Sequence, residues 1–319
     1  MKLNNIELTF ENFANEMAKL KNEKHFDYLV TIIGEDFGEE GLGCIYILEN
    51  TQNNERCSVR TIAKKVDGSD VIPTVTNLWK AADLLEREVF DFVGIKFLGH
   101  PDMRRLFLRT DFVGHPLRKD FDMSPEANKF PLTDEPEDDF TVEYSLDKDG
   151  HLVETKHRLF EEDEYVVNIG PNHPSTHGVL RLQTVIDGET VKRIYPHLGY
   201  IHRGIEKMWE GMTYPQTLAL TDRLNYLSAM MHRHALVGVI EEAMGIELSD
   251  RIHYIRTIMD ELQRIDSHLL FLGCTAQDLG ALTAFLYCMR DREHVLNVME
   301  ETTGGRLIMN YYRIGGLQA

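Results

Sequence analysis

Two histidines close together in the chain have side chains that can bind a metal or transfer a proton. His173 and His177 lie in the stretch 168–181, with Pro171 before the pair and Pro174 inside it. Histidines four residues apart chelate a metal when they lie on a helix, and the prolines make a helix unfavourable here. On a loop shaped by glycine and proline, the imidazoles would instead point into a pocket, where a group with a pKa near ~6.5 exchanges protons. The alternatives are a zinc site and imidazoles that only bond to the loop backbone.

The elements that must position these histidines can be read from the surrounding pattern. Strand-like runs at 166–170 and 178–186 flank the histidine loop, and a turn signal follows at 187–188. The rest of the chain has the apolar spacing of amphipathic helices. Its three stripes are Leu220, Leu224, Leu227 and Met231; Ile255, Ile258, Met259, Leu262, Ile265, Leu269 and Leu272; and Leu282, Phe285, Leu286, Met289 and Leu296. They predict a helical bundle that follows a small β-hairpin.

The beginning of the chain has a different texture, in which helix-like and strand-like patterns alternate. A helical stripe is followed by strand-like runs at 26–33, 43–48 and 57–66. After a turn at 67–68, a second helix is expected from Pro73 onward. The two helical stripes are Phe10, Phe13, Met17 and Leu20, and Val75, Leu78, Ala82, Leu85 and Val89. This alternation predicts an α/β domain.

An acidic stretch separates the two textures. The runs 134–139 and 161–164 are almost entirely acidic, and three prolines lie nearby. We predict an interdomain linker, with a solvated loop inside one domain as the alternative. The expected organisation is a domain over residues 1–123, an acidic linker over 124–164 and a second domain over 165–319.

Composition excludes several classes of protein. The 319 residues are 43% hydrophobic and 27% charged, which is typical of globular domains. A formal charge of -18 argues against binding nucleic acid or docking directly on anionic lipid. The four cysteines contain no C-x-x-C pair, so the chain has too few thiolates for a zinc site or an iron–sulfur cluster, and a reducing compartment is expected. The longest apolar run, 235–240, is too short to span a bilayer, so membrane association would require partners.

A segment dense in charge and glycine runs from Glu86 to Leu106 and is echoed at 114–120, with a Gly-His-Pro turn in each part. From its residues alone it is a turn-rich surface strip that binds an acidic partner or pairs with the chain's own carboxylates. It resembles the signature of the 30-kDa-type (C) subunit of respiratory complex I. The resemblance implies an α/β connector domain that docks neighbouring subunits and performs no chemistry.

The later part of the chain is similar to the 49-kDa-type (D) subunit of the same enzyme. The similarity rests on the segments 168–181, 196–207, 222–226, 264–268 and 278–281. Both signatures on one chain indicate the fused C/D form found in some bacteria. The implied fold is an α/β domain followed by a mainly α-helical bundle with a small β-hairpin, similar to the large subunit of [NiFe] hydrogenases. Because the D family continues well beyond Ala319, we expect a partial D domain.

The resemblance also implies a quinone site. The histidine that closes the H-P-x-x-H loop and the tyrosine that closes D-R-x-x-Y bind the quinone headgroup in that family, and these residues are His177 and Tyr226 here. Asp278, which precedes Leu-Gly-Ala, pairs with the histidine. A quinone has two carbonyl oxygens on opposite ring edges, and a phenol and an imidazole can each donate a proton to one of them. Asp278 would orient the ring of His177 and stabilise its charged form.

Four further residues are expected near this pocket or near a partner's cluster: His173, Arg203, Asp222 and His268. Asp222 is four residues before Tyr226, which on a helix places both on one face, where Asp222 would line the pocket or cap nearby backbone. Arg203 resembles an arginine beside the terminal cluster of the B-type subunit, where its positive charge would stabilise the reduced cluster. An ion pair between Arg203 and Glu206 is the alternative.

The implied protein is a peripheral-arm subunit of a proton-pumping NADH:quinone oxidoreductase, inactive as an isolated chain, on the cytoplasmic face of a bacterial inner membrane. The implied partners are the B-type iron–sulfur subunit, the I-type ferredoxin-like subunit and the H-type membrane subunit. Partners would hold the iron–sulfur clusters and FMN, with quinone as substrate and no metal in this chain. One alternative is a scaffold subunit that serves another donor, such as a ferredoxin or a reduced deazaflavin. A membrane-bound hydrogenase subunit is disfavoured, because Asn225 and Ser228 replace the C-x-x-C pair of hydrogenases.

Overall fold

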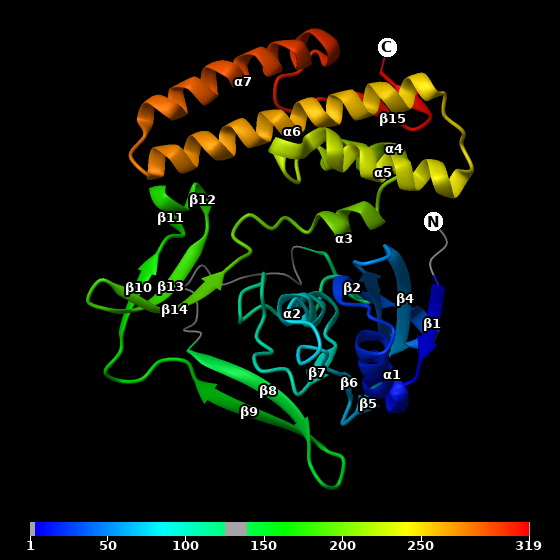
Figure 1. Ribbon diagram of the computed structural model, residues 1–319. Helices are drawn as coiled ribbons and strands as arrows, with labels where there is room; N and C mark the ends of the chain where they lie inside the picture. Colours follow the sequence, from blue (N-terminus) through cyan, green and yellow to red (C-terminus); the bar gives the residue numbers. More distant parts are fainter. Residues whose placement is uncertain (1–3, 125–138, 319) are drawn as a thin grey trace. The chain divides into compact units, whose positions relative to one another are not determined.

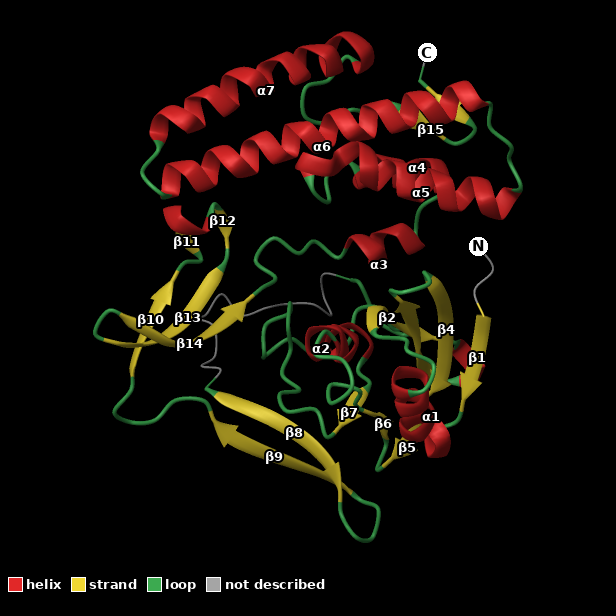
Figure 2. Ribbon diagram, in the orientation of Figure 1, coloured by secondary structure: helices red, strands yellow, loops and turns green. Residues whose placement is uncertain are grey.

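The computed structural model describes residues 4–124 and 139–318, so most of the predicted acidic run 134–139 lies outside the described residues. The chain divides into two compact units, Met1–Gly204 and Ile205–Ala319 (Figure 1). The first unit is rich in strands and the second is mainly helical (Figure 2). This order confirms the predicted succession of an α/β part and a helical part.

A four-stranded sheet forms the beginning of the first unit. Its strands, in spatial order, are β1 (Asn4–Leu8), β4 (Glu55–Ile62), β3 (Leu42–Asn50) and β2 (Tyr28–Asp36). The pair β1–β4 is parallel, and the other pairs are antiparallel. Helix α1 (Phe10–Asn22) buries Phe13, Met17 and Leu20 of the predicted stripe, whereas Phe10 at its start is only half-buried. The Phe13 ring packs 5.2 Å from the ring of Tyr46 on β3.

A second sheet of the first unit includes part of the segment that we expected to be a linker. Its strands, in spatial order, are β5 (Lys64–Val66), β6 (Ser69–Pro73), β7 (Lys96–Leu98), β8 (Phe140–Leu146) and β9 (Leu152–Arg158). The linker prediction is therefore wrong for residues 140–158, which form an antiparallel hairpin. The physical reason is an alternation of apolar and polar residues along β8, which buries Tyr144.

Helix α2 (Ala82–Val93) begins later than the predicted helix. The carboxyl group of Glu86 accepts a hydrogen bond of 2.8 Å from the backbone N–H of Val75 and one of 2.6 Å from the Thr74 hydroxyl. These bonds hold residues 74–75 in a turn before the helix. The helix ends at Gly94, which has the left-handed φ of 85° that glycine favours.

The histidine loop belongs to a small antiparallel sheet, also in the first unit. The expected strands β10 (Tyr165–Ile169) and β13 (Arg181–Asp187) pair with each other. A third strand, β14 (Thr190–His197), extends the sheet where we expected helix. Leu159, Phe160 and Val185 form its small core. The loop between β10 and β13 contains a two-stranded ladder of β11 (Asn172–His173) and β12 (Gly178–Val179).

The second unit is built from helices. They are α3 (Ile205–Glu210), α4 (Tyr214–Thr221), α5 (Ala229–Met244), α6 (Asp250–Asp278) and α7 (Leu282–Thr303). Figure 1 shows the two longest, α6 and α7, side by side as a hairpin. A short pair of strands, β15 (Tyr312–Arg313) and β16 (Gly316–Leu317), follows. Among the described residues, no helix is long and apolar enough to cross a membrane.

The first predicted helical stripe, Leu220 to Met231, is not one helix. Helix α4 ends at Thr221, Asn225 is extended, and the 3-10 helix η3 (Tyr226–Ser228) precedes α5. The prediction that Asp222 and Tyr226 share a helix face is therefore wrong. Apolar residues recur at helical spacing on both sides of the break, so the spacing alone cannot reveal it.

Candidate functional site

The two histidines of the loop are held by a compact turn. Residues Pro174–Thr176 form a single 3-10 turn, so the loop is not an α-helix, as the prolines predict. The Thr176 hydroxyl oxygen lies 2.9 Å from the carbonyl oxygens of both His173 and Gly178. The Nδ1 atom of His173 accepts a hydrogen bond of 3.2 Å from the Ser175 N–H. His173 therefore bonds to the loop backbone, as one of our alternatives expected.

His177 has an unusual backbone conformation. Its φ is 47°, in the left-handed region that residues other than glycine rarely adopt. Such a conformation costs of order 1 kcal/mol and persists only where the surrounding structure enforces it. The side chain is exposed at the end of the loop. An enforced, exposed imidazole is suited to contact a ligand or a partner.

Tyr226 lies at an exposed break between two helices. Its side chain is 54% exposed, in the 3-10 turn that follows the extended residue Asn225. The side chain of Asn225 accepts a hydrogen bond of 3.1 Å from the Leu227 N–H. This bond shapes the turn that bears the exposed Tyr226.

Asp222 is buried and forms an ion pair with Arg233. It is only 1% exposed, and its Oδ1 atom accepts a hydrogen bond of 2.8 Å from Nε of Arg233, which is equally buried. Burial raises the pKa of the Asp222 carboxyl, and the Arg233 guanidinium opposes that rise. Of our two expectations for Asp222, the structure supplies contacts for the one in which it holds nearby structure in place.

Asp278 and His268 both lie on helix α6. Asp278 is the last residue of the helix and is exposed, whereas His268 is exposed ten residues earlier. Both belong to the second unit with Tyr226, whereas His173, His177 and Arg203 belong to the first. The structure thus describes the site residues within two separate units, and their meeting at one site is part of the proposal below.

The segment before Arg203 is held by aromatic contacts that the sequence did not reveal. The His202 ring stacks on Phe92 of α2 with centroids 4.8 Å apart and lies 5.4 Å from the ring of Phe107. A Cβ atom on Gly199 would meet the Phe107 carbonyl oxygen at 2.0 Å, so only glycine fits there. These contacts pin residues 199–202 on the α/β part, next to the exposed Arg203.

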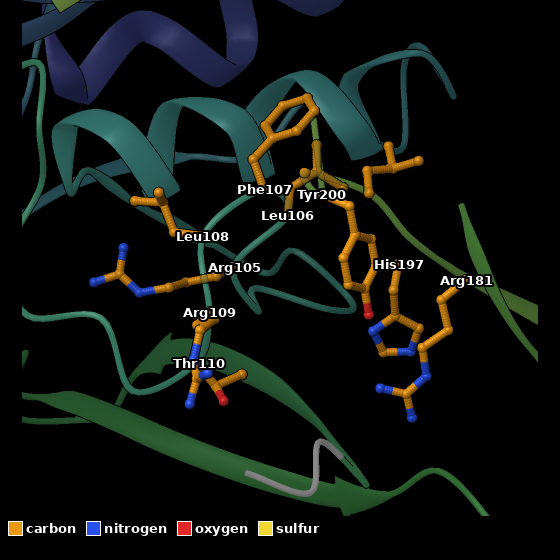
Figure 3. Close-up of a pocket in the computed structure, with 11 residues that line it drawn as sticks. Arg105, Leu106, Phe107, Leu108, Arg109, Thr110, Arg181, His197 and Tyr200 are labelled. Atoms are coloured by element: carbon orange, nitrogen blue, oxygen red, sulfur yellow. The ribbon is translucent and has the colours of Figure 1, made fainter. Parts of the chain in front are cut away.

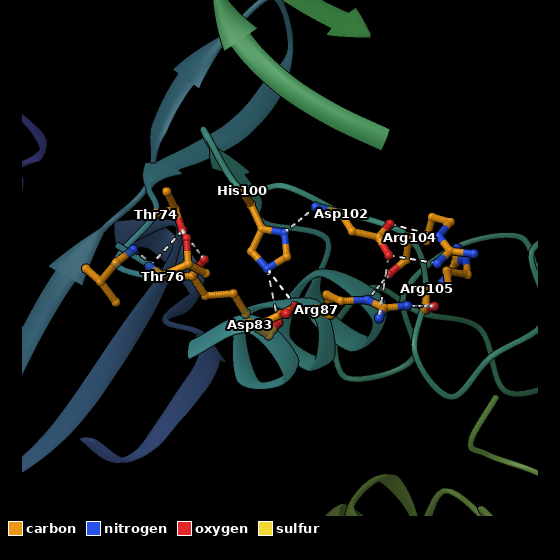
Figure 4. A network of polar contacts seen from close by, with 10 residues as sticks. Thr74, Thr76, Asp83, Arg87, His100, Asp102, Arg104 and Arg105 are labelled. Carbon is orange, nitrogen blue, oxygen red and sulfur yellow. Dashed lines mark hydrogen bonds and ion pairs between the residues drawn. The ribbon is translucent and has the colours of Figure 1, made fainter. Parts of the chain in front are cut away.

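The charged signature at 86–120 is mostly internal scaffolding. Figure 4 shows the buried His100 ring between two backbone groups: Nε2 lies 3.1 Å from the Asp83 carbonyl oxygen, and Nδ1 accepts from the Asp102 N–H at 3.0 Å. Burial lowers the pKa of His100. Arg87 donates to the carbonyl oxygens of Arg104 and Arg105 at 3.0 Å. The expectation of a surface strip is wrong for these residues, which pair inside the chain.

Asp91 organises the turn that follows this network. It is 0% exposed, and its Oδ2 atom accepts from the backbone N–H groups of Leu106, Phe107 and Leu108 at 2.7 to 3.1 Å. Arg105 donates to its other oxygen at 2.9 Å. The Asp91 carboxylate therefore fixes the backbone at Phe107. It thereby also positions the Phe107 ring, which contacts the ring of His202.

A pocket in the first unit is lined by three arginines together with other polar and several apolar side chains (Figure 3). Its volume is about 170 Å³. The loop 105–110 forms one side, and Arg181 with residues 197–200 forms the other. Neither His177 nor Arg203 lines it, so this pocket is distinct from the predicted site residues.

Metal ligands do not gather in the part of the chain that the structure describes. No group of three or more histidine, cysteine, aspartate or glutamate side chains is placed to hold an ion there. The four cysteines are unpaired, and Cys44 and Cys57 are buried. Burial raises the pKa of both thiols, which disfavours the thiolate that a metal would need.

Comparisons with known proteins identify both parts. Residues 6–127 match the family described as "Respiratory-chain NADH dehydrogenase, 30 Kd subunit", and residues 278–319 match the one described as "Respiratory-chain NADH dehydrogenase, 49 Kd subunit". The C/D subunit of the NADH-quinone oxidoreductase of Phocaeicola vulgatus is 55% identical over 314 residues, which cover 98% of this chain and 60% of that protein. The C/D subunit of the same enzyme from Sulfurihydrogenibium sp. is 37% identical over 333 residues, 98% of this chain and 57% of that protein.

The alignment with the Phocaeicola vulgatus protein also covers residues 128–277, which lie between the two family matches and contain Tyr226. A Bacteroides fragilis relative with the same name is likewise 55% identical, over 96% of this chain and 59% of its own length. The chain therefore spans about 60% of the length of these relatives. It belongs to the family of NADH-quinone oxidoreductase C/D subunits, in which a 30-kDa-type and a 49-kDa-type part share one polypeptide.

Proposed function

We propose that this chain is part of a peripheral-arm subunit of a proton-pumping NADH:quinone oxidoreductase and forms one wall of its quinone-reduction site. The observation that carries the proposal is the 55% identity to C/D subunits over 98% of the chain. The two proposed headgroup residues, His177 and Tyr226, lie on short turns between regular elements, and Asp278, the proposed partner of His177, ends a long helix. All three are exposed in their own units.

The proposed chemistry needs two proton donors on opposite sides of the quinone. His177 would donate to one carbonyl oxygen and Tyr226 to the other as electrons arrive. Asp278 would accept a hydrogen bond from the His177 ring and stabilise its protonated form. When the proton passes to the quinone, His177 becomes neutral and Asp278 no longer faces a positive charge. We propose that this change in charge drives a conformational change.

The other expected residues have supporting roles in this proposal. Arg203 would lie beside a cluster of the B-type subunit, as the resemblance to the D family implies, and the stack of His202 on Phe92 holds the segment before it. His173 shapes the His177 loop through its bond to Ser175. His268 lies on the same helix as Asp278 and would face the pocket region. Asp222 would act on Tyr226 through the backbone.

We further propose the partners and the fold relationship that the resemblance implies. The B-type, I-type and H-type subunits would surround this chain at the cytoplasmic face of the inner membrane, and partners would supply FMN and the iron–sulfur clusters that deliver electrons. The helical unit would share its fold with the large subunit of [NiFe] hydrogenases. Asn225 stands where such proteins carry a metal-binding cysteine, and its side chain bonds to the Leu227 N–H. That contact supports a turn in place of a metal site.

The test uses the assembled enzyme in membranes that carry Tyr226→Phe or His177→Ala. NADH oxidation is measured with a quinone and, separately, with ferricyanide, which takes electrons before the quinone site. We expect quinone reduction to fall by about a hundredfold, the size typical for loss of a proton donor, while the ferricyanide rate is unchanged. Retention of full quinone reduction in both variants would contradict the proposed site.

A further inference from the structure

The segment that bears Tyr226 is exposed in the middle and buried at both ends. Tyr226 is 54% and Leu224 43% exposed, whereas Asp222 is 1% and Met230 0% exposed. Inside the turn, the Asn225 side chain accepts a local hydrogen bond from the Leu227 N–H. The turn packs against α6 and α5, and its two ends are in addition held by buried side chains.

Arg233 holds the first end. Its guanidinium donates to Asp222 at 2.8 Å and to the carbonyl oxygen of Leu218, in the last turn of α4, at 2.5 Å. The carbonyl groups in the last turn of a helix lack partners within the helix, and Arg233 supplies one. Arg233 also donates to the Tyr312 carbonyl oxygen at 3.2 Å, which ties this end to the β15–β16 hairpin. These bonds, together with the one that the Thr221 hydroxyl donates to the Leu218 carbonyl oxygen at 2.8 Å, hold the end of α4 in place.

Gln263 holds the second end. Its Oε1 atom accepts a hydrogen bond of 2.6 Å from the backbone N–H of Met230, in the first turn of α5. The N–H groups of a first helical turn have no partner within the helix. Gln263 lies on α6 and is 1% exposed, so its position is set by the packing of the long helices. The start of α5 is thereby fixed two residues after the turn that contains Tyr226.

Stability alone does not account for the buried Asp222–Arg233 pair. The desolvation of two buried charges offsets most of their attraction, and a well-packed apolar pair would hold the fold equally well. What the pair and Gln263 provide is directional: each bond fixes one end of the connection between α4 and α5 at a defined place. A displacement of about 1 Å at a substrate-contacting group is enough to change catalysis strongly.

We propose that Arg233 and Gln263 are positioning residues for Tyr226, which clamp the two ends of its turn and so set where the phenol meets the quinone. This inference rests on the proposed function, because it assigns the clamp to the same quinone site. Neither residue touches the substrate. Each acts through the backbone of residues 222–230.

The test uses the assembled enzyme in membranes with Gln263→Leu, which removes the acceptor, and Gln263→Glu, which keeps an acceptor oxygen at the same reach. Glu261→Gln, on an exposed position of the same helix, is the matched control. We expect Gln263→Leu to raise the KM for quinone about tenfold with an unchanged ferricyanide rate. Gln263→Glu and Glu261→Gln should keep the KM of the unaltered enzyme.

Arg233→Lys provides the second variant, because it keeps a buried positive charge but cannot reach all three acceptors at once. If Gln263→Leu prevents assembly, Arg233→Lys tests the proposal instead, and we expect a raised KM for quinone with an unchanged ferricyanide rate. An unchanged KM, or an equal fall of the quinone and ferricyanide rates in both variants, would overturn the clamp. Tyr226→Phe, measured alongside, separates the two ideas: if it leaves quinone reduction intact, the proposed function itself fails.

Discussion

At the scale of single residues, buried polar groups of this protein act mainly on backbone. Asp91 is the clearest case, since it accepts three backbone N–H bonds and pairs with Arg105. We predict that Asp91→Ala lowers the free energy of unfolding by about 3 to 5 kcal/mol, because it leaves a largely buried guanidinium and several N–H groups unsatisfied. Urea unfolding of the chain measures this change.

The control for Asp91 is Asp111→Asn. Asp111 pairs with Arg109 at 2.9 Å, but both side chains are 29% exposed. Partly exposed pairs contribute about 0 to 1 kcal/mol. A loss from Asp91→Ala no larger than the loss from Asp111→Asn would show that the three backbone bonds do not organise the turn.

Glu86 adds a pH dependence at the same scale. Burial raises the pKa of the folded Glu86 carboxyl to about 8, against ~4.3 in an unfolded chain. The folded state then holds a proton that the unfolded state has released, so the stability contributed by Glu86 is complete below about pH 4 and is lost as the pH rises towards 8. We predict that Glu86→Gln removes a decline of roughly 1 kcal/mol per pH unit between pH 5 and 8.

Urea unfolding at several pH values tests the Glu86 prediction. Glu16→Gln, the same substitution at an exposed position, is the control. The informative quantity is the difference between each variant and the parent chain, because buried histidines such as His100 also contribute to the profile. Parallel profiles for Glu86→Gln and the parent would contradict a protonated Glu86.

At the scale of elements, the pattern of apolar residues predicted most helices and strands but not their ends. The helix break after Thr221 was not predicted, and the Arg233 bond that holds this end of α4 joins residues fifteen positions apart. The delayed start of α2 was not predicted either, and there Glu86 accepts a bond from the Val75 N–H eleven positions away. In both places a buried side chain bonds to a backbone group near the end of a helix. The spacing of apolar residues does not reveal such bonds.

Hairpin β8–β9 was missed for a different reason. The alternation of Phe140, Val142 and Tyr144 with polar residues was present in the sequence, but the surrounding acidic runs outweighed it in our interpretation. Charged residues in a strand occupy its exposed face, whereas the alternation of apolar and polar residues identifies the buried face. The alternation was the better guide here.

The end of α2 gives a prediction at this scale. Gly94 and Gly68 both have left-handed φ angles, of 85° and 79°. A Cβ atom on Gly94 would meet the His115 ring at 2.5 Å, whereas one on Gly68 would meet nothing within 4 Å. We expect Gly94→Ala to destabilise the chain by about 3 kcal/mol and Gly68→Ala by about 1 kcal/mol, because both incur the left-handed strain and only the first also clashes.

Urea midpoints of the two glycine variants provide the measurement. Their difference isolates the clash, since the backbone strain is shared. Equal midpoints would mean that the Gly-His-Pro turn around His115 yields easily and does not fix the end of α2.

At the scale of the whole molecule, the order of an α/β part and a helical part was predictable, because hydrophobic spacing changes along the chain. The family was also predictable, since its motifs are long and specific. The local geometry of the site was not. The stack of His202 on Phe92 and the buried bonds of Arg233 and Gln263 join residues distant in sequence, and the left-handed φ of His177 is a backbone conformation that its residue type alone does not specify.

We propose above that the His177 loop and the Tyr226 turn both contact the quinone. Photolabelling of the assembled enzyme with a quinone that carries an azido group on its ring tests this directly, with labelled peptides mapped by mass spectrometry. We predict labels in the segments 168–181 and 222–228, suppressed by excess unlabelled quinone. Labels that compete with quinone but fall only on other segments or other subunits would contradict the account.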